Sequence, residues 1–444
     1  MRVLVVLVLA LLAVPLGAQS PTPQIQVPYR QFTLANGLNV ILHQDSSVPA
    51  VSVNVWYHVG SANEKPGRTG FAHLFEHLMF EGSKNVKEGV FDTLLESAGG
   101  NNNGSTTNDR TNYFEDVPSN ALELALYLES DRMGYLLDTM TPQRVDGQRD
   151  VVKNERRQSY ENQPYGMASI EISKLLWPAN HPYNWPTIGY MEDLTAASHS
   201  DVVEFFKKYY APNNASLVIA GDIDLDRTRT LVEKWFNEVP RGAPVEPIAP
   251  PAATLTGVQK KTLTDRVSLP RLYLAWLTPR FYAPGDAALD VVSSVLTGGK
   301  NSRLYKRLVY DTQIAQDVSA FQQSAALGSE FQIIATARRG HTAAELQKAI
   351  DEELEKLKRD PPDAREVQRA INQYEASFYR RIERVSGKAD QLNAYYFAGA
   401  GPDFFAEDLA RYTSISPSDV QAAALRWLPA DRRVELIVEP GEKK

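Results

Sequence analysis

The sequence lacks cysteine, net positive charge and any hydrophobic stretch long enough to span a membrane permanently. The absence of cysteine excludes a lipoprotein anchor and fits an oxidising compartment. The formal net charge of −7 argues against nucleic acid as a partner. What is present, 43% hydrophobic and 23% charged residues among 444, is typical of a globular protein with two or more domains.

The N-terminus has the composition of a secretory signal peptide. Arg2 precedes an apolar run from Val3 to Leu16, and the small residues Gly17 and Ala18 follow. The run is too short for a permanent membrane anchor. A buried N-terminal helix is the alternative, but a chain start this apolar favours a signal peptide at residues 1–18. We therefore expect an exported protein, periplasmic or secreted.

The stretch from Phe71 to Gly82, FAHLFEHLMFEG, carries the clearest chemical signal. On a helix, His73, Glu76 and His77 share one narrow face, and apolar residues fill the opposite one. Two imidazoles and a carboxylate on a buried helix need bonding partners, and a metal ion would bind all three groups at once. In the order H-x-x-E-H, the two histidines bind zinc and the glutamate activates a water. The alternative is a core helix whose histidines bond to backbone carbonyls, so a third ligand must be sought.

The rest of the chain mixes strands and helices without strict alternation. Residues 32–45 predict a hairpin around an Asn-Gly turn, and residues 51–57 alternate like a half-buried strand. Helical patterns cover residues 86–98, 119–137, 142–161, 200–210 and 226–237, and residues 216–221 read as a strand. This pattern indicates an α+β fold.

A proline-rich linker at residues 241–257 divides the chain near its midpoint. It separates a first domain at residues 28–240 from a second at residues 258–440, which reads as a degenerate repeat of the first. Asn85 and Asn301, in similar short motifs, give an offset of 216 residues (301 − 85), and Pro212 and Pro429 give 217 (429 − 212). Chance similarity of short polar strings is the alternative to duplication.

The second domain lacks the metal motif. At the offset of 216, His73, Glu76 and His77 correspond to Leu289, Val292 and Ser293. The same helix can evidently pack with apolar residues at these positions. We therefore expect the second domain to serve packing or substrate binding.

Glu155 is the most plausible third ligand, because it lies on a separate predicted helix, 78 positions after His77 (155 − 77). A carboxylate from another helix completes a His₂Glu catalytic site and leaves one position open for water. By spacing alone Glu155 is one of several candidates, and a solvated helix charge beside Lys153, Arg156 and Arg157 is the alternative.

These motifs resemble the pitrilysin/insulinase family of zinc metallopeptidases, in particular the secreted bacterial members built as one two-domain subunit. The resemblance covers residues 28–440 and rests on four motifs and the degenerate second half. The motifs are GFAHLFEH from Gly70, GG-x-x-N-x-x-T from Gly99, RDVVKNE from Arg149, and Ala220-Gly221-Asp222.

The resemblance implies two homologous α/β-sandwich domains that form a clamshell around a chamber. It implies one zinc ion (Zn²⁺) per chain, held by His73, His77 and Glu155, with Glu76 as the general base. It also implies that an extended substrate pairs with the strand at Asn103, Gly104, Ser105 and Thr106.

The sequence departs from the family pattern in two places. Many members carry a glutamate seven positions before the ligand glutamate. Gln148 stands there; its amide can still form a hydrogen bond near the metal ligands but cannot contribute charge. Many also carry an arginine and, seven residues later, a tyrosine in the second domain, where this chain has Val309 and Gln316. Arg303 and Tyr310 have the right spacing but lie earlier in the chain.

The sequence therefore predicts a zinc endopeptidase that cleaves peptides or unfolded segments. A non-catalytic subunit that keeps the fold for binding is the alternative from another class. The missing arginine and tyrosine favour a heterodimer with a homologous subunit that has lost the zinc motif but supplies both groups. A chain that works alone, as a monomer or homodimer, is the competing prediction.

Overall fold

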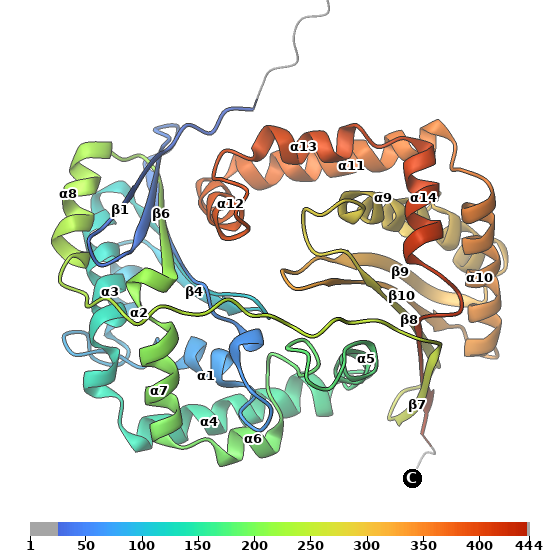
Figure 1. Cartoon of the computed structure of the whole chain (residues 1–444), viewed down its shortest axis with the longest axis horizontal. Helices are drawn as coiled ribbons and strands as arrows, with labels where there is room; N and C mark the ends of the chain where they lie inside the picture. Colours follow the sequence, from blue (N-terminus) through green and yellow to red (C-terminus); the bar gives the residue numbers. More distant parts are fainter. Residues whose placement is uncertain (1–24, 442–444) are drawn as a thin grey trace, which may run out of the picture.

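The computed structural model describes residues 25–441, so the predicted signal peptide at residues 1–18 lies outside the described part. The described chain forms two halves, each built on one mixed β-sheet with helices packed against it (Figure 1). This architecture confirms the predicted α+β class with a duplicated unit.

The first sheet has six strands in the order β1-β2-β6-β3-β5-β4. β2 and β6 are parallel, and every other neighbouring pair is antiparallel. The strands are β1 (Arg30–Thr33), β2 (Asn39–Gln44), β3 (Ala50–Tyr57), β4 (Asn101–Thr106), β5 (Thr111–Pro118) and β6 (Ala215–Gly221).

The second sheet repeats this topology without a counterpart of β1. Its order is β7-β11-β8-β10-β9, with β7 and β11 parallel. The strands are β7 (Gln259–Asp265), β8 (Arg271–Thr278), β9 (Ala315–Gln323), β10 (Ser329–Ala337) and β11 (Val434–Pro440). Strand for strand, the order matches β2-β6-β3-β5-β4, which is the topology expected of a duplication.

The helices follow the same repeat. The first half contains α1 (Phe71–Leu78), α2 (Val90–Ser97), α3 (Leu122–Tyr135), α4 (Pro142–Arg156), α5 (Ala168–Leu176), α6 (Met191–Ala196), α7 (His199–Tyr209) and α8 (Leu225–Phe236). The second contains α9 (Asp286–Thr297), α10 (Ala343–Arg359), α11 (Ala364–Glu383), α12 (Val385–Phe397), α13 (Phe405–Thr413) and α14 (Pro417–Trp427). Between α8 and β7, residues 237–258 form no helix or strand and run from one half to the other (Figure 1).

Each half contributes one helix to the other half. α12 packs on β3 and β6 of the first sheet, where Leu392 and Tyr395 join a buried cluster with Ile41 and Val218. α5 packs on β8 and β11 of the second sheet, where Ile172 contributes to a second shared cluster. The two helices begin 217 residues apart (385 − 168), so they occupy equivalent places in the repeat.

This exchange corrects one expectation from the sequence. β3 was expected to be half-buried, but all its residues after Ala50 are buried, because α12 covers the face that carries Ser52, Asn54 and Trp56. Within the stretch from Phe71 to Gly82, helix α1 ends at Leu78. Helix α5 itself was not expected.

Candidate metal centre

Helix α1 carries the H-x-x-E-H motif, and its start is fixed from outside the helix. Gly70 precedes it with φ of 90°, a left-handed conformation that favours glycine. A Cβ on Gly70 would lie 3.0 Å from the Cα of Gly189, so both segments of the chain need glycine at this close approach. Gly70 has no side chain to cap the helix. Instead the buried Glu64 carboxylate accepts hydrogen bonds from the N–H groups of Gly70 at 2.9 Å and Ala72 at 2.8 Å.

The three predicted ligands lie together. One oxygen of Glu155, on α4, lies 3.6 Å from Nε2 of His73 and 3.3 Å from Nε2 of His77. All three ligand atoms lie within 4.8 Å of one another. The two imidazole rings meet edge to face, 4.8 Å apart. Among residues 25–441 no other trio of histidine and acidic side chains comes together in this way.

The electrostatics of the trio suit metal binding. Burial lowers the pKa of His73, more than the nearby Glu155 and Glu76 carboxylates raise it. The hydrogen bond with His77 holds the pKa of Glu155 below its usual value, and the proximity of His73 adds to this. Neutral imidazole and ionised carboxylate are the forms that coordinate a metal.

The residues present fit a zinc ion. Two imidazole nitrogens and one carboxylate oxygen converging from two helices are the donor set of a catalytic zinc site. The other nitrogen of His73, Nδ1, is buried and has no hydrogen-bond partner within the described residues. The orientation of this ring therefore depends on the packing of α1 and on what binds Nε2.

Glu76 faces β4, the edge strand of the first sheet. A Cβ added at Gly104 would lie 3.3 Å from the Cγ of Glu76, so the glycine lets the strand approach this side chain closely. β4 pairs with β5 on one side and ends the sheet on the other. Asn103 is exposed, whereas Gly104, Ser105 and Thr106 are half-buried. The predicted substrate strand thus lies at a free edge beside the predicted base.

Gln148 lies on α4 but does not contact the three ligands. Its Nε2 donates a hydrogen bond of 2.5 Å to Glu81, which follows α1. Burial raises the pKa of Glu81, and the Glu88 carboxylate raises it further. Gln148 therefore links the two ligand helices through Glu81 rather than through a ligand.

The second half has no equivalent site at the matching helix. Gly285 precedes α9 with φ of 100°, as Gly70 precedes α1. Pairing these glycines gives an offset of 215 (285 − 70), one less than the sequence motifs gave. The positions equivalent to His73, Glu76 and His77 are then Ala288, Val291 and Val292. They carry no metal-binding group in either alignment.

Sequence reasoning missed Glu64. It lies six positions before Gly70, outside the helix, and no local pattern links a single glutamate to a cap at that distance. Helix capping is predicted from the residue at the N-cap position, and here that residue is Gly70, which has no side chain.

Comparisons with known proteins identify the family of the chain. The family described as Insulinase (Peptidase family M16) matches residues 39–172, and the Peptidase M16 inactive domain matches residues 196–374. Zinc protease PqqE of Helicobacter pylori is 31% identical over 393 residues, 87% of each chain. No helix among the described residues is both long and apolar enough to cross a membrane.

Solved structures share the whole fold. The crystal structure of a protease from Helicobacter pylori has a TM-score of 0.87 and 28% identity, and the match covers 94% of this chain and 100% of that one. The periplasmic protease PqqL from Escherichia coli has a TM-score of 0.77 at 16% identity; the match covers 95% of this chain but 48% of PqqL. The matches to both halves and to PqqE confirm the predicted resemblance: the chain belongs to the peptidase M16 (insulinase) family.

Proposed function

We propose that the protein is a zinc-dependent endopeptidase that cleaves peptides or unfolded polypeptide segments. The observation that carries the proposal is the convergence of His73, His77 and Glu155 within 4.8 Å, with Glu76 on the same helix. The names of its relatives, zinc proteases, support the same activity. A non-catalytic binding subunit is the second candidate, and the complete set of four residues argues against it.

In this proposal His73, His77 and Glu155 hold one zinc ion, and Glu76 is the general base. When bound, zinc supplies a Lewis acid that polarises the scissile carbonyl and lowers the pKa of a water. Glu76 takes the proton of the attacking water and passes it to the nitrogen of the leaving amine. Gln148 supports the site indirectly, through its hydrogen bond to Glu81.

The substrate pairs with the free edge of β4, at Asn103, Gly104, Ser105 and Thr106. Main-chain hydrogen bonds to an edge strand require an extended peptide, which a compact folded domain does not offer. The close approach of Gly104 to Glu76 supports this position, because a peptide on β4 lies beside the base.

The same proposal includes the division of the chain at residues 28–240, 241–257 and 258–440, and export of the mature protein to the periplasm or outside the cell. It also includes a homologous partner subunit. Two observations favour the partner: Arg303 is bound by Glu366 through two hydrogen bonds of 2.8 Å, and the Tyr310 side chain is 74% exposed. Arg303 is therefore already paired with a carboxylate, and the surface of Tyr310 is mostly free of contacts within the described residues.

The test of the proposed base is Glu76→Gln. Because the amide cannot accept the proton, the cleavage rate of an unstructured peptide should fall by a factor of about 10² to 10⁴. Glu96→Gln, an exposed carboxylate on α2, is the matched control and should leave the rate unchanged. If Glu76→Gln cleaves the peptide at the rate of an active wild type, Glu76 is not the base. If the wild type itself does not cleave the peptide, the non-catalytic alternative is favoured.

A further inference from the structure

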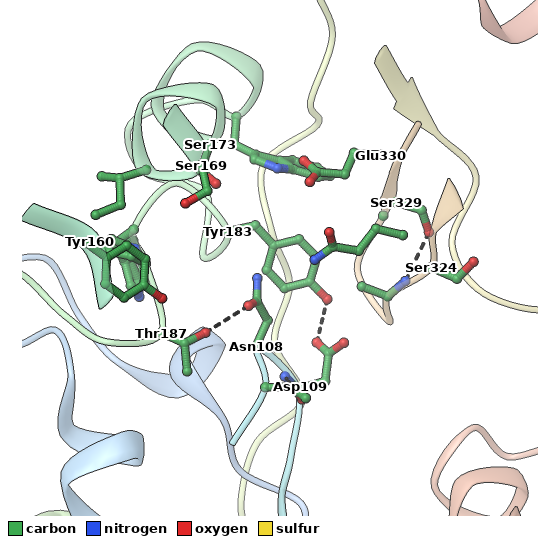
Figure 2. Close-up of a pocket in the computed structure, with 18 residues that line it drawn as sticks. Asn108, Asp109, Tyr160, Ser169, Ser173, Tyr183, Thr187, Ser324, Ser329 and Glu330 are labelled. Carbon is green, nitrogen blue, oxygen red and sulfur yellow. Dashed lines mark hydrogen bonds between the residues drawn. The ribbon is translucent and has the colours of Figure 1, made fainter. Parts of the chain in front are cut away.

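A cavity of about 400 Å³ lies where the two halves meet (Figure 2). The first half lines it with the turn after β4 and with α5. The second half lines it with the turn between β9 and β10 and with Glu330 at the start of β10. Neither half encloses this space alone.

The cavity adjoins the proposed catalytic centre through two elements. Tyr160, which lines it, lies on the π-helical turn η4 (Arg157–Glu161) that continues α4, five positions after Glu155. Burial raises the pKa of Tyr160, and the nearby Glu155 carboxylate raises it further. Asn108 and Asp109 follow directly after β4. A peptide on β4 would therefore lead into the cavity.

The walls are aromatic and held in place. Tyr160, Trp177, Tyr183 and Trp185 all line the space. The rings of Trp177 and Tyr183 meet at 90° with their centroids 5.2 Å apart. Trp185 donates its Nε1 hydrogen bond to the carbonyl of Ser61 at 2.9 Å. Fixed aromatic faces attract a planar cation.

The ionisable side chains of the lining include acidic groups but no basic ones. Asp109 and Glu330 are its two ionisable carboxyl groups, and no lysine, arginine or histidine lines the cavity. Asp109 is already engaged, since it accepts a hydrogen bond from the hydroxyl of Tyr183 (Figure 2). It also accepts one of 2.9 Å from the N–H of Ala326. These bonds join the β4–β5 turn to the β9–β10 turn.

Glu330 is the carboxylate that lacks a counter-charge. It extends from β10 towards Ser173 on α5 (Figure 2) and accepts a hydrogen bond of 2.7 Å from Gln332. No ion pair within residues 25–441 involves Glu330, and burial raises its pKa more than hydrogen bonds from Gln332 and Trp177 lower it. A buried carboxylate of this kind favours a cationic ligand, which would supply the missing charge.

We propose that this cavity is a side-chain pocket for an arginine of the peptide substrate, bound by Glu330 and stacked on the aromatic walls. The inference rests on the proposed peptidase function and adds a substrate class to it. Arginine fits better than lysine, because its planar guanidinium stacks on rings and can bind a carboxylate through two parallel hydrogen bonds.

The test uses peptides in which a single arginine is moved through the positions on both sides of the scissile bond. Each is paired with a citrulline peptide, which keeps the shape and removes the charge. At one position, kcat/KM should be at least about tenfold higher for arginine. Glu330→Gln should remove this preference, so that the arginine and citrulline peptides give equal kcat/KM. Glu355→Gln, an exposed carboxylate on α10, should keep the preference.

A second variant separates the cavity from its charge. Ser169→Leu places a larger side chain at an exposed position of α5 on the cavity wall, where folding should not suffer, and keeps Glu330. It should also reduce the arginine preference. If no position prefers arginine, or if Glu330→Gln keeps the preference, the pocket assignment is wrong while the peptidase proposal stands.

Binding to the Glu76→Gln protein tests the pocket without hydrolysis. Fluorescence anisotropy of the labelled arginine and citrulline peptides should give dissociation constants that differ by about tenfold, and the difference should vanish when Glu330→Gln is added. Equal constants, or no saturable binding of either peptide, would overturn the pocket. A clear difference in binding, together with a wild-type protein that cleaves neither peptide, would support the pocket and reject the peptidase function.

Discussion

Glu64 shows how one buried side chain outside a helix can fix the helix that carries the chemistry. Its carboxylate is 7% exposed and holds the first N–H groups of α1, and burial raises its pKa well above the usual value. Thr69 is held nearby by Asp193, which accepts hydrogen bonds from the N–H and hydroxyl of Thr69. The axial position of His73 and His77 therefore depends on this cap.

Replacing Glu64 by alanine should destabilise the protein by about 1–3 kcal/mol, because two buried N–H groups lose their acceptor. Glu64→Gln keeps one oxygen acceptor and should cost less. Urea unfolding monitored by circular dichroism measures both. Equal stability of the alanine variant and the wild type would mean that the cap does not hold α1.

At this scale, the residues that the sequence predicts are those linked by local spacing. The spacing of His73, Glu76 and His77 on one turn of helix was enough to predict their shared face. Glu155 needed the family resemblance, because its distance along the chain carries no geometric information. Glu64 and Glu330 act through contacts made only by the folded chain, and no sequence pattern indicates either.

At the scale of elements, the exchanged helices α5 and α12 join the two halves. Polar contacts supplement the apolar packing of α12: Asn393 donates to the backbone carbonyl of Asn54 at 3.0 Å, and Ser216 donates to Asn393 at 2.7 Å. On the other side, Tyr165, just before α5, donates to the carbonyl of Leu269 at 2.9 Å. One face of each sheet is therefore covered by a helix from the other half.

The strand pattern in the sequence could not predict this exchange. Ser52, Asn54 and Trp56 alternate with valines in β3, and alternation normally indicates one solvent-facing side. The polar side chains instead meet a helix that lies more than 300 residues later in the chain. The hairpin at β1 and β2 and the helices α7 and α8 were predictable, because their signals are local.

Truncating the centre of α12 should therefore weaken both halves together. Leu392→Ala removes a side chain with no exposed surface and should lower the free energy of unfolding by about 2–5 kcal/mol. Leu425→Ala, at a position 55% exposed on α14, is the control and should change it by less than about 0.5 kcal/mol. Thermal unfolding of the variant should remain one transition. Two separated transitions would show that the halves fold independently.

At the scale of the whole molecule, the proposed catalytic centre lies in one half, and the second half offers no obvious group opposite it. Arg303 is engaged by Glu366, with both side chains 17% exposed. The match with PqqL, which spans about half of that longer chain, indicates that two units of this size occur in one fold.

The partner proposal predicts that peptide cleavage by the purified chain rises when a homologous protein without H-x-x-E-H is added. An increase of about tenfold or more is expected, because remote contacts position the substrate for the transition state. Analytical ultracentrifugation should detect a one-to-one complex. Full activity of the chain alone, unchanged by any such protein, would support a monomer or homodimer instead.

The zinc stoichiometry of the chain tests the central claim most directly. After removal of metal by a chelator, zinc should be titrated into the wild type, Glu76→Gln and Glu155→Ala, with binding followed by isothermal titration calorimetry. The account predicts one zinc per chain for the wild type and for Glu76→Gln, and a loss of tight binding in Glu155→Ala, because only the latter removes a ligand. Wild-type affinity in Glu155→Ala, or no zinc binding by the wild type, would contradict the proposed centre.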